Sequence, residues 1–260
     1  MTSSLPLDTA LPSGSPLLQT RGLSVRFGGL IAVDSVDAVI RAGELVGIIG
    51  PNGAGKTTFF NAISGVTRPT GGSLAIQGRE LGGARPDVFA RCGVARTFQT
   101  PRVFGAMTVS GNIEFGLQFA GRNRPEPARL RGSAEILAMI GLAGRAAAPA
   151  SEITPSQQRL LEIGMALSTR PSLLLLDEVA AGLTENELET TARLIRSLRD
   201  ELGLCIVWIE HAVGTLLRHV ERVIVLHQGR KLADGSPAEV IANAEVVEAY
   251  LGDEVAGQPA

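Results

Sequence analysis

A glycine-rich run after a short apolar segment has residue types and spacing suited to phosphate chemistry. It matches the pattern G-x-x-x-x-G-K-[ST], and its residues are Gly50, Pro51, Asn52, Gly53, Ala54, Gly55, Lys56, Thr57 and Thr58. Glycines let backbone N–H groups converge on an anion, and a helix predicted at residues 56–64 would point its positive end there. Lys56 would contact the β- and γ-phosphates, and the Thr57 hydroxyl would bind Mg²⁺. The sequence therefore predicts a nucleotide-binding loop rather than an ordinary glycine-rich turn.

Two adjacent acids, Asp177 and Glu178, follow the apolar run at residues 173–176. Acids at the end of a buried strand are costly unless a cation or a water molecule uses them. Asp177 would emerge at the carboxyl edge of a sheet, where open α/β sheets bind ligands, and would complete the Mg²⁺ shell. Glu178 would orient or deprotonate an attacking water. The alternative is an ordinary solvated strand end.

The segments around these motifs predict a parallel α/β fold. Three short, continuously apolar runs, at residues 45–49, 173–176 and 205–209, are typical of buried parallel strands. Apolar residues recur with helical spacing between them, at positions 160, 163 and 167 and again at 188, 192, 195 and 202. Alternating strands and helices indicate a parallel sheet whose carboxyl edge carries both motifs.

Other segments depart from that pattern. Residues 17–27 and 31–40 mix apolar and polar positions, as half-exposed antiparallel strands do. Residues 100–150 contain no strand pattern and are interpreted as a helical insertion with a linker at residues 123–131. We expect a disordered leader at residues 1–16 and a tail of the same kind at residues 253–260.

The composition of the chain argues against several classes of protein. The 260 residues are 45% apolar and mean hydropathy is +0.20, yet the apolar runs fall far short of the roughly 20 residues that a membrane-spanning helix needs. A net charge of −2 argues against a nucleic-acid partner. Cys92 and Cys205 make no disulfide framework and fit a reducing cytosol. The first basic residue is Arg21, so no signal peptide is expected.

The order of the motifs resembles that of the ATP-binding subunits of ABC transporters, over roughly residues 17–252. The resemblance implies a P-loop NTPase fold of the ABC ATPase type, with an N-terminal antiparallel β subdomain and a helical subdomain at about residues 100–168. It implies that Phe27 stacks on adenine, that Gln99 links Mg²⁺ and the water to a membrane partner, and that His211 contacts the γ-phosphate. Residues 181–184 would be the D-loop, with Thr184 where the family usually has Asn or Asp.

The resemblance also implies an assembly. In this family two subunits sandwich two ATP molecules, and each site combines the phosphate loop of one subunit with the signature motif of the other. The implied partners are a second ATPase subunit, two membrane-spanning permease subunits and, indirectly, an extracytoplasmic substrate-binding protein. The implied location is peripheral, on the cytoplasmic face of the cell membrane. The alternatives are a soluble ABC-type ATPase and a nucleotide-binding regulatory module with weak turnover.

Shorter matches resemble the ATPases of branched-chain amino acid importers. They lie at residues 25–33, 95–99, 104–109, 235–240 and 248–252. Urea and short-chain amide importers use closely similar subunits. The resemblance therefore implies uptake of branched-chain amino acids or a related small polar solute through a separate permease.

The signature region departs from the family pattern. The family has Leu-Ser-Gly-Gly-Gln where this chain has Ile153, Thr154, Pro155, Ser156 and Gln157. Thr154 and Gln157 predict a capping box with Pro155 in the first turn, so a helix should still begin here. Without the two glycines, close approach of the backbone to phosphate is harder. Our hypothesis is an asymmetric heterodimer with one weak site; the alternatives are that Thr154 and Ser156 substitute adequately, and that the dimer is a homodimer.

Overall fold

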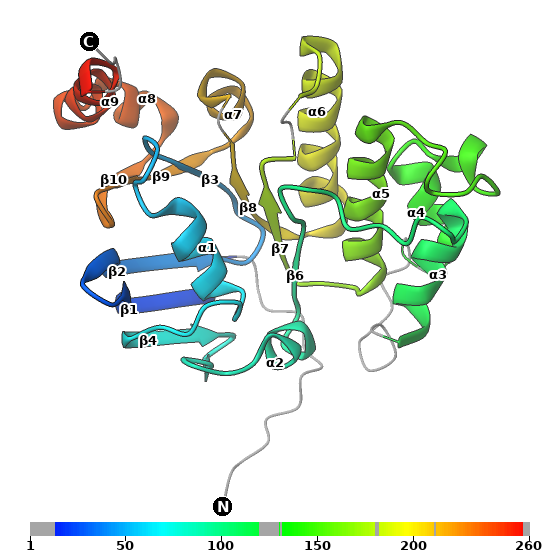
Figure 1. Ribbon diagram of the computed structural model, residues 1–260, viewed down its shortest axis with the longest axis horizontal. Coiled ribbons are helices and arrows are strands. Elements are labelled where there is room, and N and C mark those ends of the chain that lie inside the picture. Colours follow the sequence, from blue (N-terminus) through cyan, green and yellow to red (C-terminus); the bar gives the residue numbers. More distant parts are fainter. Residues whose placement is uncertain (1–13, 120–129, 131, 180–181, 211, 257–260) are drawn as a thin grey trace, which may run out of the picture.

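The computed structural model describes residues 14–119, 130, 132–179, 182–210 and 212–256. Within this part of the chain, six strands form the central sheet in the order β10-β9-β3-β8-β7-β6 (Figure 1). The strands are β3 (Leu45–Ile49), β6 (Val94–Arg96), β7 (Leu173–Asp177), β8 (Cys205–Ile209), β9 (Arg222–His227) and β10 (Arg230–Gly235). All neighbours are parallel except β10 and β9. The three apolar runs predicted as buried parallel strands are β3, β7 and β8, which confirms that prediction.

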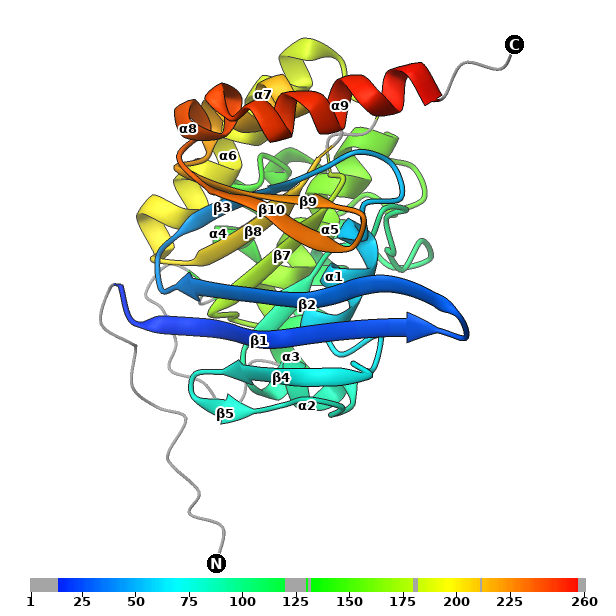
Figure 2. The same ribbon diagram turned by 90° about the vertical axis from the view of Figure 1, so that its left-hand side faces the viewer.

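A second sheet lies beside the first and is antiparallel (Figure 2). Its strands, among the described residues, are β1 (Pro16–Phe27), β2 (Leu30–Arg41), β4 (Gly71–Ile76) and β5 (Arg79–Glu80), in the order β2-β1-β4-β5. The two antiparallel strands predicted from the sequence are β1 and β2. β1 begins one residue inside the predicted leader, because Pro16 already pairs with Arg41.

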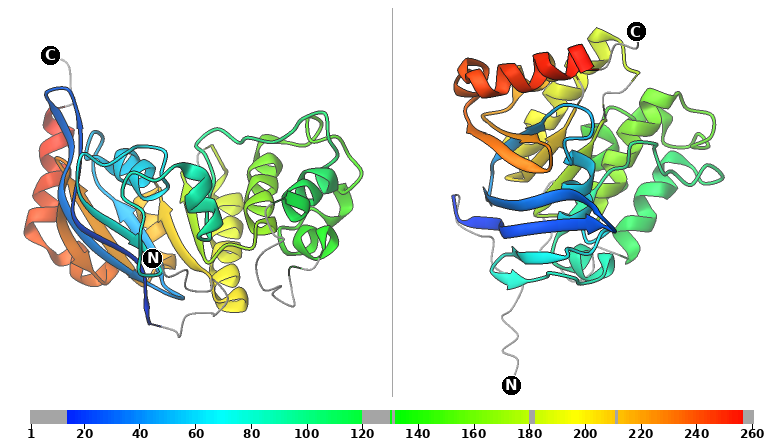
Figure 3. Two further views of the ribbon diagram at one scale, coloured as in Figure 1. Left: turned by 90° about the horizontal axis from the view of Figure 1, so that it is seen from below. Right: turned by 60° about the vertical axis from the view of Figure 1, so that its left-hand side comes forward.

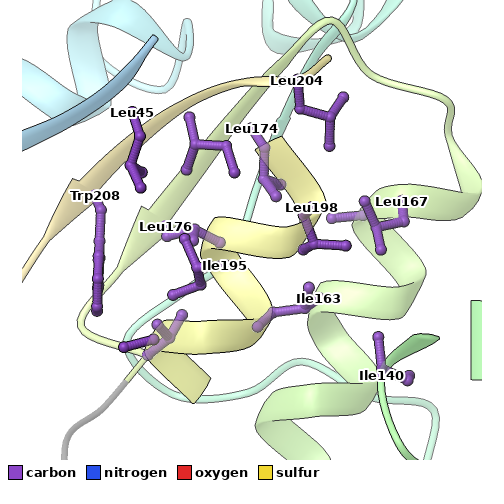
Figure 4. Close-up of a cluster of buried hydrophobic side chains, with 14 of the residues drawn as sticks. Leu45, Ile140, Ile163, Leu167, Leu174, Leu176, Ile195, Leu198, Leu204 and Trp208 are labelled. Atoms are coloured by element: carbon purple, nitrogen blue, oxygen red, sulfur yellow. The ribbon is translucent and has the colours of Figure 1, made fainter. Parts of the chain in front are cut away.

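Alternate residues of the parallel strands face two different cores. Leu174, Leu176 and Trp208 belong to a cluster with helices α5 (Pro155–Ser168), α6 (Glu185–Leu202) and α7 (Val213–His219). Figure 4 shows Ile195 and Leu198 of α6 between the sheet and α5. Val46 and Leu175 point the other way, toward α1 (Lys56–Ile63) and the antiparallel sheet. Because both faces are buried, the carboxyl ends of β3, β8 and β7 are firmly held side by side.

The helical insertion forms one end of the molecule (Figure 3). It contains α3 (Val109–Phe119), α4 (Ser133–Met139) and a short 3₁₀ helix at Ala143–Arg145, and it packs through α3 and α4 on α5. This helical segment lies where the sequence predicts a helical insertion. Most of the predicted linker at residues 123–131 lies outside the described residues, as do residues 1–13 of the predicted leader.

The remaining helices are α2 (Pro86–Arg91), α8 (Pro237–Ala242) and α9 (Ala244–Ala256). Residues 253–256 of the predicted tail lie in α9, which continues to Ala256. Cys92 and Cys205 are both buried thiols, unpaired within the described chain. None of the described helices combines the length and the apolar character needed to cross a bilayer.

Candidate functional site

The phosphate loop joins the end of β3 to the start of α1, as the sequence predicts. Gly55 is the N-cap of α1 with φ +95°, and a Cβ there would lie 2.3 Å from the Ala32 carbonyl oxygen. A Cβ at Gly50 would lie 2.1 Å from the Leu226 carbonyl oxygen. Both positions therefore accept only glycine, and the loop is held against β2 and β9 with its backbone curled. Gly65, with φ +76°, follows the end of α1.

Lys56 is the first residue of α1 and is buried. Its Nζ donates to the Gly50 carbonyl oxygen at 2.5 Å and to the Pro51 carbonyl oxygen at 2.9 Å. Burial lowers the pKa of Lys56, and the nearby Glu178 carboxylate opposes that shift. Contact with phosphates would require the ammonium group to exchange these carbonyl oxygens for phosphate oxygens, which are stronger partners because they are charged.

Asp177 ends β7 and is buried. Its Oδ2 accepts a hydrogen bond from Arg96 Nη2 at 2.9 Å, and its backbone N–H donates to Thr97 Oγ1 at 3.1 Å. Arg96 also donates to Asn61 and Ser64, so one guanidinium joins the end of β7 to α1. Burial lowers the pKa of Arg96, and Asp177 raises it. Arg96 carries no motif of its own and has no predicted role, although it lies inside the short match at residues 95–99.

Glu178 has a left-handed backbone, with φ +49°, which is uncommon for a residue with a side chain. Contacts with other described residues hold it. Its N–H donates to the Ile209 carbonyl oxygen at 3.0 Å, and its own carbonyl oxygen accepts from Arg159 Nη1 at 2.8 Å. Its Oε2 accepts from Gln99 Nε2 at 2.6 Å. The structure thus brings together Gln99 and Glu178, which are 79 positions apart in the sequence.

The signature region is the N-terminus of α5. Thr154 is the N-cap, and its Oγ1 accepts from the Gln157 N–H at 3.2 Å while Gln157 Oε1 accepts from the Thr154 N–H at 3.1 Å. The predicted capping box is therefore confirmed. The Ser156 hydroxyl lies 3.0 Å from Thr154 Oγ1. Hydrogen bonds from the Thr184 backbone, from its side chain and from Ser156 lower the pKa of Glu187, so a carboxylate lies beside this helix end.

The other predicted site residues fall in different surroundings. Phe27 ends β1, and 54% of it is exposed, which leaves an aromatic ring at the surface. Thr184 is the N-cap of α6. Asn or Asp, usual in the family at this position, are N-cap residues too. His211 and Ala181 lie outside the described residues.

The donor groups assigned to Mg²⁺ fit that ion in kind. Thr57 offers an exposed hydroxyl, Gln99 an amide oxygen and Asp177 a carboxylate. All are oxygen ligands, and Mg²⁺ in nucleotide sites is bound through one or two carboxylates together with phosphates and water.

Two sheets and a helical layer around one phosphate loop make up an ATP-binding cassette. The chain belongs to the ABC transporter family, whose sequence profile matches residues 33–181. The profile of the branched-chain amino acid ATP-binding cassette transporter matches residues 230–256. Membership makes this chain an ATPase of the P-loop class, which confirms the family, fold and enzyme class predicted from its motifs.

Two curated relatives are similar over almost their whole length. The high-affinity branched-chain amino acid transport ATP-binding protein LivG of Salmonella typhimurium is 41% identical over 252 residues, which cover 92% of this chain and 98% of LivG. The corresponding protein BraF of Pseudomonas aeruginosa is 38% identical over 251 residues, with the same coverage.

Solved structures of cassettes share the fold. The ADP conformation of an ATP-binding cassette of an ABC transporter aligns with a TM-score of 0.80 at 28% identity, covering 91% of this chain and 99% of that one. A nucleotide-free cassette aligns with a TM-score of 0.79 at 26% identity, covering 90% and 98%.

Proposed function

We propose that this chain binds and hydrolyses ATP to drive uptake of branched-chain amino acids, or a related small polar solute, through a separate permease. The observation that carries the proposal is the meeting of Gln99 with Glu178 at the carboxyl edge of the parallel sheet, the edge to which β3 delivers the phosphate loop. The substrate class is inferred from LivG and BraF, which are similar over nearly the whole chain.

The chemistry divides among a few groups. The loop of residues 50–58 and the N-terminus of α1 hold the phosphates of ATP, and Lys56 adds a positive charge. Glu178 is the general base that activates water, and Gln99 orients it. His211 contacts the γ-phosphate and Phe27 stacks on adenine, as the family resemblance implies.

Mg²⁺ would be held by Thr57, Asp177 and Gln99. When bound, it neutralises charge on the phosphate oxygens. Asp177 would then share its carboxylate between the ion and Arg96, whose Nη2 lies 2.9 Å from Oδ2. The guanidinium fixes the orientation of that carboxylate.

The assembly we propose has a second ATPase subunit, two permease subunits and, indirectly, a substrate-binding protein, with no nucleic acid. At the N-terminus of α5 the Gln157 N–H already donates to Thr154 Oγ1, and Pro155 has no N–H, so neither can bind a phosphate. These features favour a heterodimer in which the altered signature of this chain serves the partner's loop weakly. A homodimer remains the other arrangement.

A location on the cytoplasmic face of the membrane follows from the permease partners. The helical insertion offers them an apolar contact, because Phe104 and Phe115 are each nearly half exposed and their ring centroids lie 5.1 Å apart. An aromatic pair of this kind is typical of interface anchors.

Reconstitution tests the proposal. The chain would be purified with its permease, inserted into vesicles and supplied with the binding protein and labelled leucine or urea. We expect ATP-dependent leucine uptake together with phosphate release. Turnover without a permease partner would favour a soluble ATPase, and nucleotide binding without turnover would favour a regulatory module. Uptake of urea without uptake of leucine would show that the transported solute is urea and not a branched-chain amino acid.

A further inference from the structure

A buried carboxylate on α5 holds the segment that carries Gln99. Glu162 is only 5% exposed. Its Oε1 accepts the Arg102 N–H at 3.0 Å, and its Oε2 accepts the Phe98 N–H at 3.3 Å. Each oxygen therefore fixes one end of residues 98–102. An ionised carboxylate is costly to bury unless its oxygens are hydrogen-bonded, so these contacts are expensive to leave unmade.

The ring of Phe98 is held as well. The Arg102 guanidinium lies 4.1 Å from the centroid of the Phe98 ring, and the Arg96 guanidinium lies 4.8 Å from the same centroid. Cations within about 6 Å of a ring centroid are attracted to its face. Phe98 is thus fixed by its ring and by its backbone, which leaves the neighbouring Gln99 little freedom of position.

One helical turn before Glu162, Arg159 holds the other half of the catalytic pair. Its Nη1 donates to the Glu178 carbonyl oxygen at 2.8 Å. Residues three apart lie on the same face of a helix. One face of α5 therefore contacts the backbone of Glu178 and the backbone on both sides of Gln99. The two segments that α5 holds are joined to each other by the Gln99–Glu178 hydrogen bond of 2.6 Å.

We propose that Glu162 is a positioning residue for ATP hydrolysis, which fixes residues 98–102 on α5 and so sets the Gln99 amide against Glu178. The inference rests on the proposed function, in which those two residues act on water. Glu162 itself does not touch the reacting atoms. It acts on turnover through Gln99, and its loss should leave nucleotide binding at the phosphate loop intact.

The test compares Glu162→Gln with wild type in the full transporter complex. Glutamine keeps the volume and one acceptor oxygen but turns an NH₂ group toward a backbone N–H. We expect kcat for ATP to fall about tenfold, since small misplacements of catalytic groups are costly, while KM stays within about twofold. Hydrogen exchange of the Phe98 and Arg102 amides should accelerate. The exposed Glu152→Gln is the matched control and should match wild type in all three measurements.

A double-mutant cycle decides whether Glu162 works through Gln99. In a Gln99→Ala background, Glu162→Gln should cost no further turnover, because the group it positions is gone. Independent, multiplying losses would overturn the inference, as would an unchanged kcat in the single variant or an equal change in KM. Failure of the wild-type complex to hydrolyse ATP would instead refute the proposed function and, with it, this inference.

Discussion

Two helices begin in opposite ways in this molecule. The N-cap of α1 is Gly55, which has no side chain, so the N–H groups of the first turn remain for an external partner. The N-cap of α5 is Thr154, whose capping box with Gln157 satisfies N–H groups internally, and Pro155 has no N–H. The N-terminus of α1 can therefore bind an anion, whereas the N-terminus of α5 is capped by its own side chains, which stabilises the helix. One chain can therefore keep an intact phosphate loop although its signature region lacks the two glycines.

The largest effect is expected from a substitution of Glu178, which tests whether the phosphate loop at the N-terminus of α1 belongs to a site that hydrolyses ATP. Glu178→Gln removes the base but keeps an oxygen to accept from Gln99. ATP hydrolysis should fall at least about 100-fold while ATP binding is retained. Steady-state phosphate release and nucleotide titration measure the two quantities, with Glu152→Gln as control. Undiminished turnover would remove Glu178 from the role of base.

The next effect tests the open start of α1. Gly55→Ala places a Cβ 2.3 Å from the Ala32 carbonyl oxygen at φ +95°, so the loop must shift. ATP affinity should fall at least about tenfold. Gly53→Ala is the matched control, because φ there is also positive, at +78°, yet its Cβ would meet nothing within 4 Å among the described atoms. If both variants lose ATP affinity equally, the loss comes from the positive φ alone and not from the contact with the Ala32 carbonyl oxygen.

A smaller effect tests the closed start of α5. Thr154→Ala removes the cap, which should cost about 1 kcal/mol of unfolding free energy, as should Thr184→Ala at the start of α6. If the signature of this chain serves its partner weakly, turnover of the reconstituted complex should change less than about twofold. A large loss of turnover at Thr154, beyond that at Thr184, would contradict the weak site.

The smallest effect lies further along α5. Burial raises the pKa of Glu162, against the bonds from Arg102 and Phe98. With the folded-state pKa above the ordinary value of about 4.3, its contribution to stability is full at lower pH and lost as pH rises through the folded-state pKa. Glu162→Gln does not titrate. Its unfolding free energy relative to wild type should therefore rise as the pH increases above the ordinary value of about 4.3, in denaturant titrations at several pH values. A falling difference would contradict this.

Much of the fold could be predicted because its signals are local. The three buried strands are continuous apolar runs, and the capping box needs only residues 154–157. β6 has three residues and no pattern of its own, since its place comes from pairing with β7. The strands β9 and β10 form an antiparallel hairpin that was not predicted from the sequence.

The residues of the candidate site also differ in whether a local sequence signal predicts them. The phosphate loop and the acid pair are motifs of consecutive residues, and their roles stay predictions. Arg96 and Glu162 carry no such signal, because their partners Asp177 and Arg102 are 81 and 60 positions away. The pairing of β6 with β7 and the packing of α5 against β6 create those contacts.

The neighbours of β3 have a consequence for synthesis of the chain. β3 pairs with β8 and β9, and Gly229 N–H donates to the Ala54 carbonyl oxygen at 3.0 Å. The residues that support the phosphate loop thus leave the ribosome long after the loop itself. Pairing between such distant strands forms late. A nascent chain that carries the whole nucleotide motif should therefore remain unable to retain ATP until residue 229 has emerged from the ribosome.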